Sequence, residues 1–171
     1  MPAETLVSVS EYLASSYDPD CDYVDGEILE RNVGEYDHAK LQKRLILYLG
    51  NREAELRIHV VPEQRVQVSR TRFGVPDVCV VAGAEPTEQV FTKPPALCIE
   101  ILSPEDRMVR MLPKIHEYLS IGVEYVWLID PQERAALSFS RLDPQGAVCD
   151  VLRTENPSIE IPLQAAFDLD A

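Results

Sequence analysis

VPDVCVVA (residues 75–82) and PALCIEILSP (residues 95–104) are the two stretches of sequence that decide the fold. Each is an apolar run of strand length, and each carries a single acid, Asp77 in the first run and Glu100 in the second. If the runs pair as antiparallel strands, Asp77 lies opposite Glu100 and Cys79 lies opposite Cys98, with all four side chains on one face. The pattern predicts two carboxylates at the same end of a sheet.

Two ionised carboxylates that face each other need a counter-ion. They repel one another, and each is costly to bury alone. A divalent cation such as Mg²⁺, or a nearby lysine, meets that need. The alternative interpretation is that Val-Pro-Asp is a turn entering a strand and that Glu100 reaches solvent at a strand end.

Three helices are predicted from capping residues and apolar periodicity. They span residues 8–16, 35–57 and about 111–121. The first begins at Ser8, which forms a capping box with Glu11, and the third ends before Gly122.

Strands account for most of the remaining chain. Besides the two acidic runs, they are predicted over residues 58–62, 65–69, 124–130, 135–141 and 147–153, with a tight hairpin turn at residues 25–26. The strand, helix and strand that follow Glu100 form a right-handed crossover, which makes the two strands parallel. The predicted class is α/β (α+β), a mixed sheet with flanking helices in a single domain over residues 1–171.

Composition is that of an ordinary globular domain, with 46% hydrophobic and 26% charged residues. No apolar run has the length of a membrane helix, and the N-terminus lacks the features of a signal peptide, so a cytoplasmic location is expected. The four cysteines show no zinc-ligand spacing and are expected to be reduced core thiols. A bridge between Cys79 and Cys98 is the alternative.

The formal net charge of −13 disfavours tight binding to nucleic acid. Residues 38–76 nevertheless hold eight basic residues against three acidic ones. This segment directly precedes Asp77 and is predicted to line one side of a cleft, with Arg70 and Arg72 as phosphate contacts. Alternatively, its cations form the solvated face of a helix.

Several short motifs occur in an order that resembles a known family. They are YVDGEILE (23–30), His38, VPDVCVV, LCIEILSP, Lys114 with Tyr118, and GVEYVWLIDP (122–131). The ordered set resembles the Uma-type restriction endonuclease family, a branch of the PD-(D/E)xK nuclease superfamily. The resemblance implies a restriction-endonuclease-like fold, DNA as the substrate, and Mg²⁺ as the cofactor with Mn²⁺ as a substitute.

The resemblance also implies roles for individual residues. Asp77 and Glu100 become metal ligands together with the backbone carbonyl of Ile101, and Glu27 binds the metal directly or through water. His38 contacts phosphate or carries a proton. The alternatives are that Glu27 is an exposed hairpin acid and that His38 is an ordinary helix-start residue.

Leu102 departs from the family pattern. A lysine two residues after Glu100 would share its face of the strand and act on the attacking water or the phosphate. Lys114 is the predicted substitute, provided that its helix begins near residue 111 and places it in the first turn. A helix that begins at Pro104 would put Lys114 roughly 15 Å away.

The leading hypothesis is a Mg²⁺-dependent DNA endonuclease with Asp77, Glu100 and Lys114 as catalytic residues and a metal-activated water as the nucleophile. The alternative is a catalytically weakened domain of the same fold that serves as a DNA- or protein-binding module. A homodimer formed through the strand within residues 122–130 or through the C-terminal hairpin is compatible with both.

Overall fold

A six-stranded mixed sheet forms the centre of the computed structural model, which describes residues 5–168. Residues 1–4 and 169–171 of the predicted domain lie outside the described part. The strand order is β10-β9-β8-β7-β6-β3. The strands are β3 (Ile58–Pro62), β6 (Val78–Ala82), β7 (Leu97–Ile101), β8 (Tyr125–Asp130), β9 (Ala135–Ser140) and β10 (Ala147–Val148). Strands β7 and β8 are parallel, as predicted, and the other neighbours are antiparallel.

The register between β6 and β7 is the predicted one. Cys79 lies opposite Cys98, and Val78 lies opposite Ile99. Continuing this register by one residue brings Asp77 opposite Glu100. All four cysteines are free.

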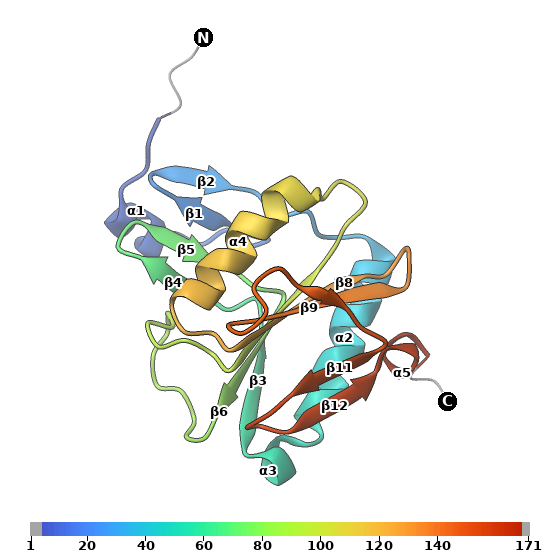
Figure 1. The fold of residues 1–171 in the computed structure, drawn as a ribbon. Coiled ribbons are helices and arrows are strands. Elements are labelled where there is room, and N and C mark those ends of the chain that lie inside the picture. Colours follow the sequence, from blue (N-terminus) through green and yellow to red (C-terminus); the bar gives the residue numbers. More distant parts are fainter. Residues whose placement is uncertain (1–4, 169–171) are drawn as a thin grey trace.

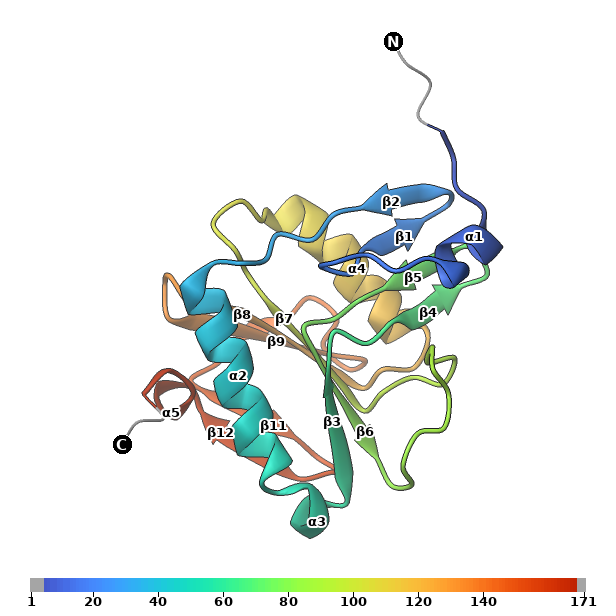
Figure 2. The same cartoon turned by 180° about the vertical axis from the view of Figure 1, so that it is seen from behind.

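Two helices cover the two faces of this sheet (Figures 1 and 2). Helix α2 (Tyr36–Gly50) buries Leu41, Leu45 and Leu49 against one face, because residues four apart share one side of a helix. Helix α4 (Met108–Ser120) buries Ile115 and Tyr118 against the other face, on which Cys79 and Cys98 lie. Asp77 and Glu100 belong to the α4 face, since side chains alternate along a strand.

A smaller sheet of order β2-β1-β5-β4 lies beside the central one (Figure 1). Its strands are β1 (Asp22–Val24), β2 (Glu27–Leu29), β4 (Val66–Ser69) and β5 (Arg72–Gly74), and α1 (Val9–Ala14) packs on it. The predicted β1–β2 hairpin turns at Asp25 and Gly26, with φ angles of 50° and 101°. Positive φ at both turn positions favours an Asp-Gly pair. The three-residue strand β5 was not predicted, because it is too short for a periodic signal.

The C-terminal part differs from the prediction of one strand over residues 147–153. Strand β10 pairs with β9, but the chain then leaves the central sheet. Strand β11 (Val151–Thr154) pairs instead with β12 (Ile159–Pro162), and helix α5 (Leu163–Phe167) follows. The reason is burial: Leu152 and Ile161 of this hairpin join the core beside α2.

Two predicted helices have different bounds in the structure. The helix expected over residues 35–57 is divided into α2 and the short α3 (Glu53–Leu56). Helix α4 begins at Met108, so Pro113 lies inside it rather than in its first turn. No helix among residues 5–168 is long and apolar enough to span a membrane.

Strand β8 cannot add a partner strand from a second copy, because β7 and β9 occupy both of its edges. The predicted dimer through this strand is therefore wrong. The central sheet has its edges at β10 and β3.

Gly74 allows β5 to approach α4 closely, and this contact can be tested. A Cβ added at Gly74 would lie 2.7 Å from the Tyr118 hydroxyl oxygen, which is too close. We expect Gly74→Ala to lower the free energy of unfolding by about 1–3 kcal/mol, as overpacking does. The measurement is urea denaturation. Gly50→Ala is the control, because a Cβ there meets nothing within 4 Å. Equal effects of the two substitutions would contradict the prediction.

Candidate active site

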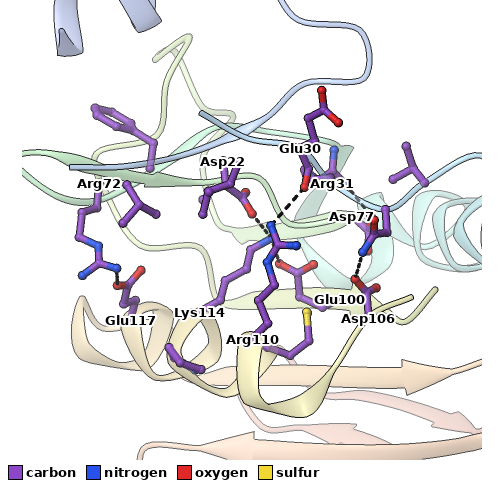
Figure 3. Close-up of a pocket in the computed structure, with 18 of the residues that line it drawn as sticks. Asp22, Glu30, Arg31, Arg72, Asp77, Glu100, Asp106, Arg110, Lys114 and Glu117 are labelled. Atoms are coloured by element: carbon purple, nitrogen blue, oxygen red, sulfur yellow. Dashed lines mark hydrogen bonds and ion pairs between the residues drawn. The ribbon is translucent and has the colours of Figure 1, made fainter. Parts of the chain in front are cut away.

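Asp77 and Glu100 lie in a pocket of about 280 Å³ between the small sheet, β7 and α4 (Figure 3). Each residue is only 3% exposed to solvent. The charged residues that line the pocket are Asp22, Glu30, Arg31, Arg72, Asp77, Glu100, Asp106, Arg110, Lys114 and Glu117. The β6–β7 register thus brings both predicted carboxylates into a single cavity.

Both carboxylate oxygens of Asp77 are engaged. The Oδ2 atom accepts a hydrogen bond from the Ile101 backbone N–H at 2.7 Å. The Oδ1 atom lies 2.6 Å from Arg31 Nη2 and 3.3 Å from His38 Nε2. Burial alone would raise the pKa of Asp77, but the His38 hydrogen bond and the Arg31 charge outweigh burial and lower it below its ordinary value.

Glu100 has two partners from α4. Lys114 Nζ lies 2.9 Å from Glu100 Oε1, and the Tyr118 hydroxyl donates to the same oxygen at 2.9 Å. Burial raises the pKa of Glu100 to about 7. The charge of Lys114 opposes this rise, while Asp77 and Asp22 add to it. The two central carboxyls therefore have pKa values shifted in opposite directions.

Lys114 extends from α4 between two acids (Figure 3). Its Nζ lies 3.0 Å from Asp22 Oδ2 as well as 2.9 Å from Glu100 Oε1. Burial lowers the pKa of Lys114, but the charges of Asp22 and Glu100 outweigh it and raise the pKa above its ordinary value. Helix α4 starts at Met108, which is neither of the two starts considered from the sequence (residues 104 and 111). Lys114 nevertheless lies close to Glu100, because the axis of α4 crosses over the pocket.

One wall of the pocket is the connection between β2 and α2. Asn32 donates to Asp106 Oδ1 at 2.7 Å, and the Ser103 hydroxyl donates to the Asn32 carbonyl. The Ser103 N–H donates to Asp106 Oδ2 at 2.8 Å. These bonds tie the connection to the loop after β7.

Several residues with a predicted site role lie elsewhere. Glu27 is exposed on β2 and borders a different surface hollow. Arg70 is exposed in the turn between β4 and β5 and does not line the pocket. His38 is 2% exposed and lies behind Asp77, so it contacts the carboxylate and not the cavity. Arg72 does line the pocket, with Nη2 2.8 Å from Glu117.

The basic segment over residues 38–76 reaches the pocket only at its end, where residues 72–74 line the cavity. Of its eight lysines and arginines, only Arg72 lines the cavity. Arg65 pairs with Asp20 at 2.7 Å and covers the ring of Tyr12, so it stabilises the small sheet. Of the two residues predicted to contact phosphate, Arg72 lines the pocket and Arg70 does not.

Asp22 and Arg31 were missed by reasoning from the sequence. A buried carboxylate pair does require a cation, and that requirement was recognised. No sequence signal, however, points to an arginine that is 46 positions from Asp77 in the chain and contacts it only through the fold.

The side chains around the pocket can supply only some of the ligands that a divalent cation needs. Among the described residues, no group of three or more His, Cys, Asp or Glu could hold a metal ion. Two carboxylates do fit Mg²⁺, which is often bound through one or two carboxylates and keeps several waters. Ile101 borders the pocket, which is compatible with a backbone carbonyl as a further ligand.

The chain is similar to known proteins in sequence and in fold. Residues 9–171 match the family Uma2, described as "Putative restriction endonuclease". The chain is also similar in fold to the crystal structure of a putative nuclease belonging to DUF820 from Anabaena variabilis ATCC 29413, with a TM-score of 0.81 and 21% identity. That match covers 94% of this chain and 97% of the other. No curated protein matches the chain.

The predicted mixed sheet with flanking helices is thus confirmed as a restriction-endonuclease-like fold. Because the family model covers nearly all of the sequence, the chain belongs to the Uma2 family.

Proposed function

We propose that the protein is a Mg²⁺-dependent endonuclease that hydrolyses DNA phosphodiester bonds in this pocket. The observation that carries the proposal is the convergence of Asp77, Glu100 and Lys114, with Lys114 Nζ 2.9 Å from Glu100. Membership of the Uma2 family supports the reaction class.

Asp77 and Glu100 would hold the cation, with the Ile101 carbonyl as a third protein ligand. A divalent cation bound there lowers the pKa of a bound water and offsets negative charge that develops on the phosphate. Mn²⁺ is expected to replace Mg²⁺. Burial of both carboxylates excludes bulk water, which strengthens every charge interaction inside the pocket.

Lys114, on α4, would act on the phosphate from the side of the pocket opposite to Glu100, which is on β7. Its ammonium group is held by Asp22 and Glu100, and the raised pKa keeps it charged at neutral pH. A fixed positive charge near a phosphate stabilises the transition state without reorganisation. Arg72 and Arg110, at the pocket wall, are proposed contacts for the flanking phosphates.

The first test removes one proposed catalytic group at a time. We expect Asp77→Asn, Glu100→Gln and Lys114→Met each to lower Mg²⁺-dependent cleavage by at least about 100-fold, because each removes charge that acts on the transition state. The measurement is the rate of nicking of supercoiled plasmid and of cleavage of single-stranded circular DNA.

Glu85→Gln is the matched control, because Glu85 is exposed and remote from the pocket. It should cleave like the wild type. Cleavage that survives Asp77→Asn and Glu100→Gln, or wild-type protein that cleaves neither substrate with Mg²⁺ or Mn²⁺, would refute the proposal.

The second test uses the raised pKa of Glu100. The carboxyl, with a pKa of about 7, must lose its proton before it can hold a cation. Mn²⁺ should therefore bind about tenfold more weakly at pH 6 than at pH 8, with release of a proton at the lower pH.

His38 is a second group that titrates at this site. Burial lowers its pKa, but Asp77 outweighs burial and raises the pKa, and loss of the His38 proton also strengthens Mn²⁺ binding as the pH rises. Calorimetry in two buffers measures both quantities, and equal affinity at the two pH values would contradict the prediction.

A second candidate function is a binding module of the same fold. It is favoured by one observation: Arg31 and Lys114 already neutralise the two carboxylates from within the chain. In that case the wild type would bind DNA or a protein without cleavage.

Leu102→Lys tests whether Lys114 performs the role of the lysine that the family pattern places at position 102. Leu102 directly follows β7, two residues after Glu100, and is partly buried beside the core under α4, so we expect a lysine there to extend toward the pocket. If Lys114 performs the role of the missing lysine, Leu102→Lys should restore part of the cleavage lost in Lys114→Met. The measurement is the plasmid rate of the double variant, with Leu102→Met as its control. A double variant that stays inactive while the wild type cleaves would show that the two positions are not equivalent.

The proposed setting is the cytoplasm, where four free thiols are compatible with a reducing compartment. A homodimer formed through the β11–β12 hairpin is also proposed, since this hairpin pairs only with itself and does not extend the central sheet. Sedimentation of the purified protein measures its oligomeric state.

A further inference from the structure

Arg31 occupies the place that a cation would need at Asp77. Its Nη2 lies 2.6 Å from Asp77 Oδ1, and its side chain is 5% exposed. The same side chain lines the pocket. Arg31 is thus a buried internal cation at the proposed metal site.

The other two partners of Asp77 are fixed in place. The Ile101 N–H belongs to β7 and cannot leave Asp77 Oδ2 without disturbing the strand. His38 is buried in the first turn of α2 and does not border the cavity. Arg31, in contrast, belongs to the connection over residues 30–35, which has no regular structure. A ligand that reaches Asp77 from the pocket can therefore displace Arg31 and neither of the other two.

The remaining contacts of Arg31 are weak. Its Nη1 lies 3.4 Å from the Asp20 carbonyl oxygen and 3.9 Å from Glu63. A guanidinium group has five N–H donors in a planar fork that suits a phosphate. Most of these donors have no strong partner in the described contacts, so a phosphate in the pocket offers Arg31 a better set of acceptors than it now has.

We propose that Arg31 and the divalent cation compete for Asp77, and that Arg31 turns to the substrate phosphate when the cation binds. This inference rests on the proposed function. Arg31 then balances the charge of the ionised Asp77 carboxylate while no cation is bound, and it contacts the substrate when the site is loaded. Cation and DNA binding become positively coupled, because each favours the position of Arg31 that the other requires.

The experiment measures Mn²⁺ binding without DNA, by calorimetry at pH 8. We expect Arg31→Met to bind Mn²⁺ about tenfold more tightly than the wild type. This is the factor expected if Arg31 leaves Asp77 free for the cation in about a tenth of the wild-type molecules. Arg134→Met is the matched control, because Arg134 makes an exposed ion pair with Asp168 at 2.8 Å. It should leave the affinity unchanged.

A second measurement tests the contact with phosphate. Binding of a short fluorescent DNA duplex is followed in saturating Mn²⁺ in the Lys114→Met background, which keeps both carboxylates. Adding Arg31→Met should weaken DNA binding about tenfold, since a charge-assisted phosphate contact is lost. Tighter Mn²⁺ binding together with weaker DNA binding is a combination that a merely structural role would not produce.

Arg31→Lys serves where Arg31→Met does not fold. The lysine keeps the positive charge beside Asp77 but lacks the second nitrogen that rests near Asp20 and Glu63, so Mn²⁺ should bind about threefold more tightly than to the wild type. Unchanged Mn²⁺ affinity in the folded Arg31 variants, with binding lost in Asp77→Asn, would overturn the inference and leave the proposed function standing. Absence of Mn²⁺ binding in every variant would refute both.

Discussion

Two carboxylates buried on neighbouring strands are the constraint on which the rest of this structure depends. Asp77 and Glu100 are each 3% exposed, and an isolated buried carboxylate costs several kcal/mol. The surrounding elements therefore supply compensation. Lys114 arrives from α4, His38 from α2, and Arg31 from the connection that joins the small sheet to α2. The packing of three elements on the strand ends is thus also an electrostatic requirement.

The fold was largely predictable because its main signals are local. Strand alternation fixed the register that brings Cys79 opposite Cys98, and with it the common face of the two acids. The Asp25-Gly26 turn and the parallel crossover through α4 follow from equally local rules. Errors arose where burial decides the outcome. The strand expected over residues 147–153 divides because Leu152 is buried in a separate hairpin, and no pattern in the sequence marks the division.

The candidate site was predictable only in its centre. The two carboxylates come from adjacent strands, so their meeting follows from pairing alone. Arg31 depends on how the small sheet lies over the central one, which the sequence does not encode locally. Glu27 illustrates the opposite error, because a motif placed it near the site while the structure leaves it exposed on β2, outside the pocket. Lys114 came close to Glu100 from a helix that starts earlier than predicted, since its position depends on the path of the helix axis.

Charge balance inside the pocket connects these observations. Asp22, Asp77 and Glu100 face Arg31 and Lys114, so three carboxylates meet two permanent cations, with His38 behind them. The pKa of Glu100, raised by burial to about 7, is consistent with this excess of negative charge, because one proton makes this five-residue cluster neutral. A divalent cation in place of that proton would leave this five-residue cluster with a net charge of +1. An acidic protein, with a formal net charge of −13, could then attract a phosphate at this one point without a basic surface.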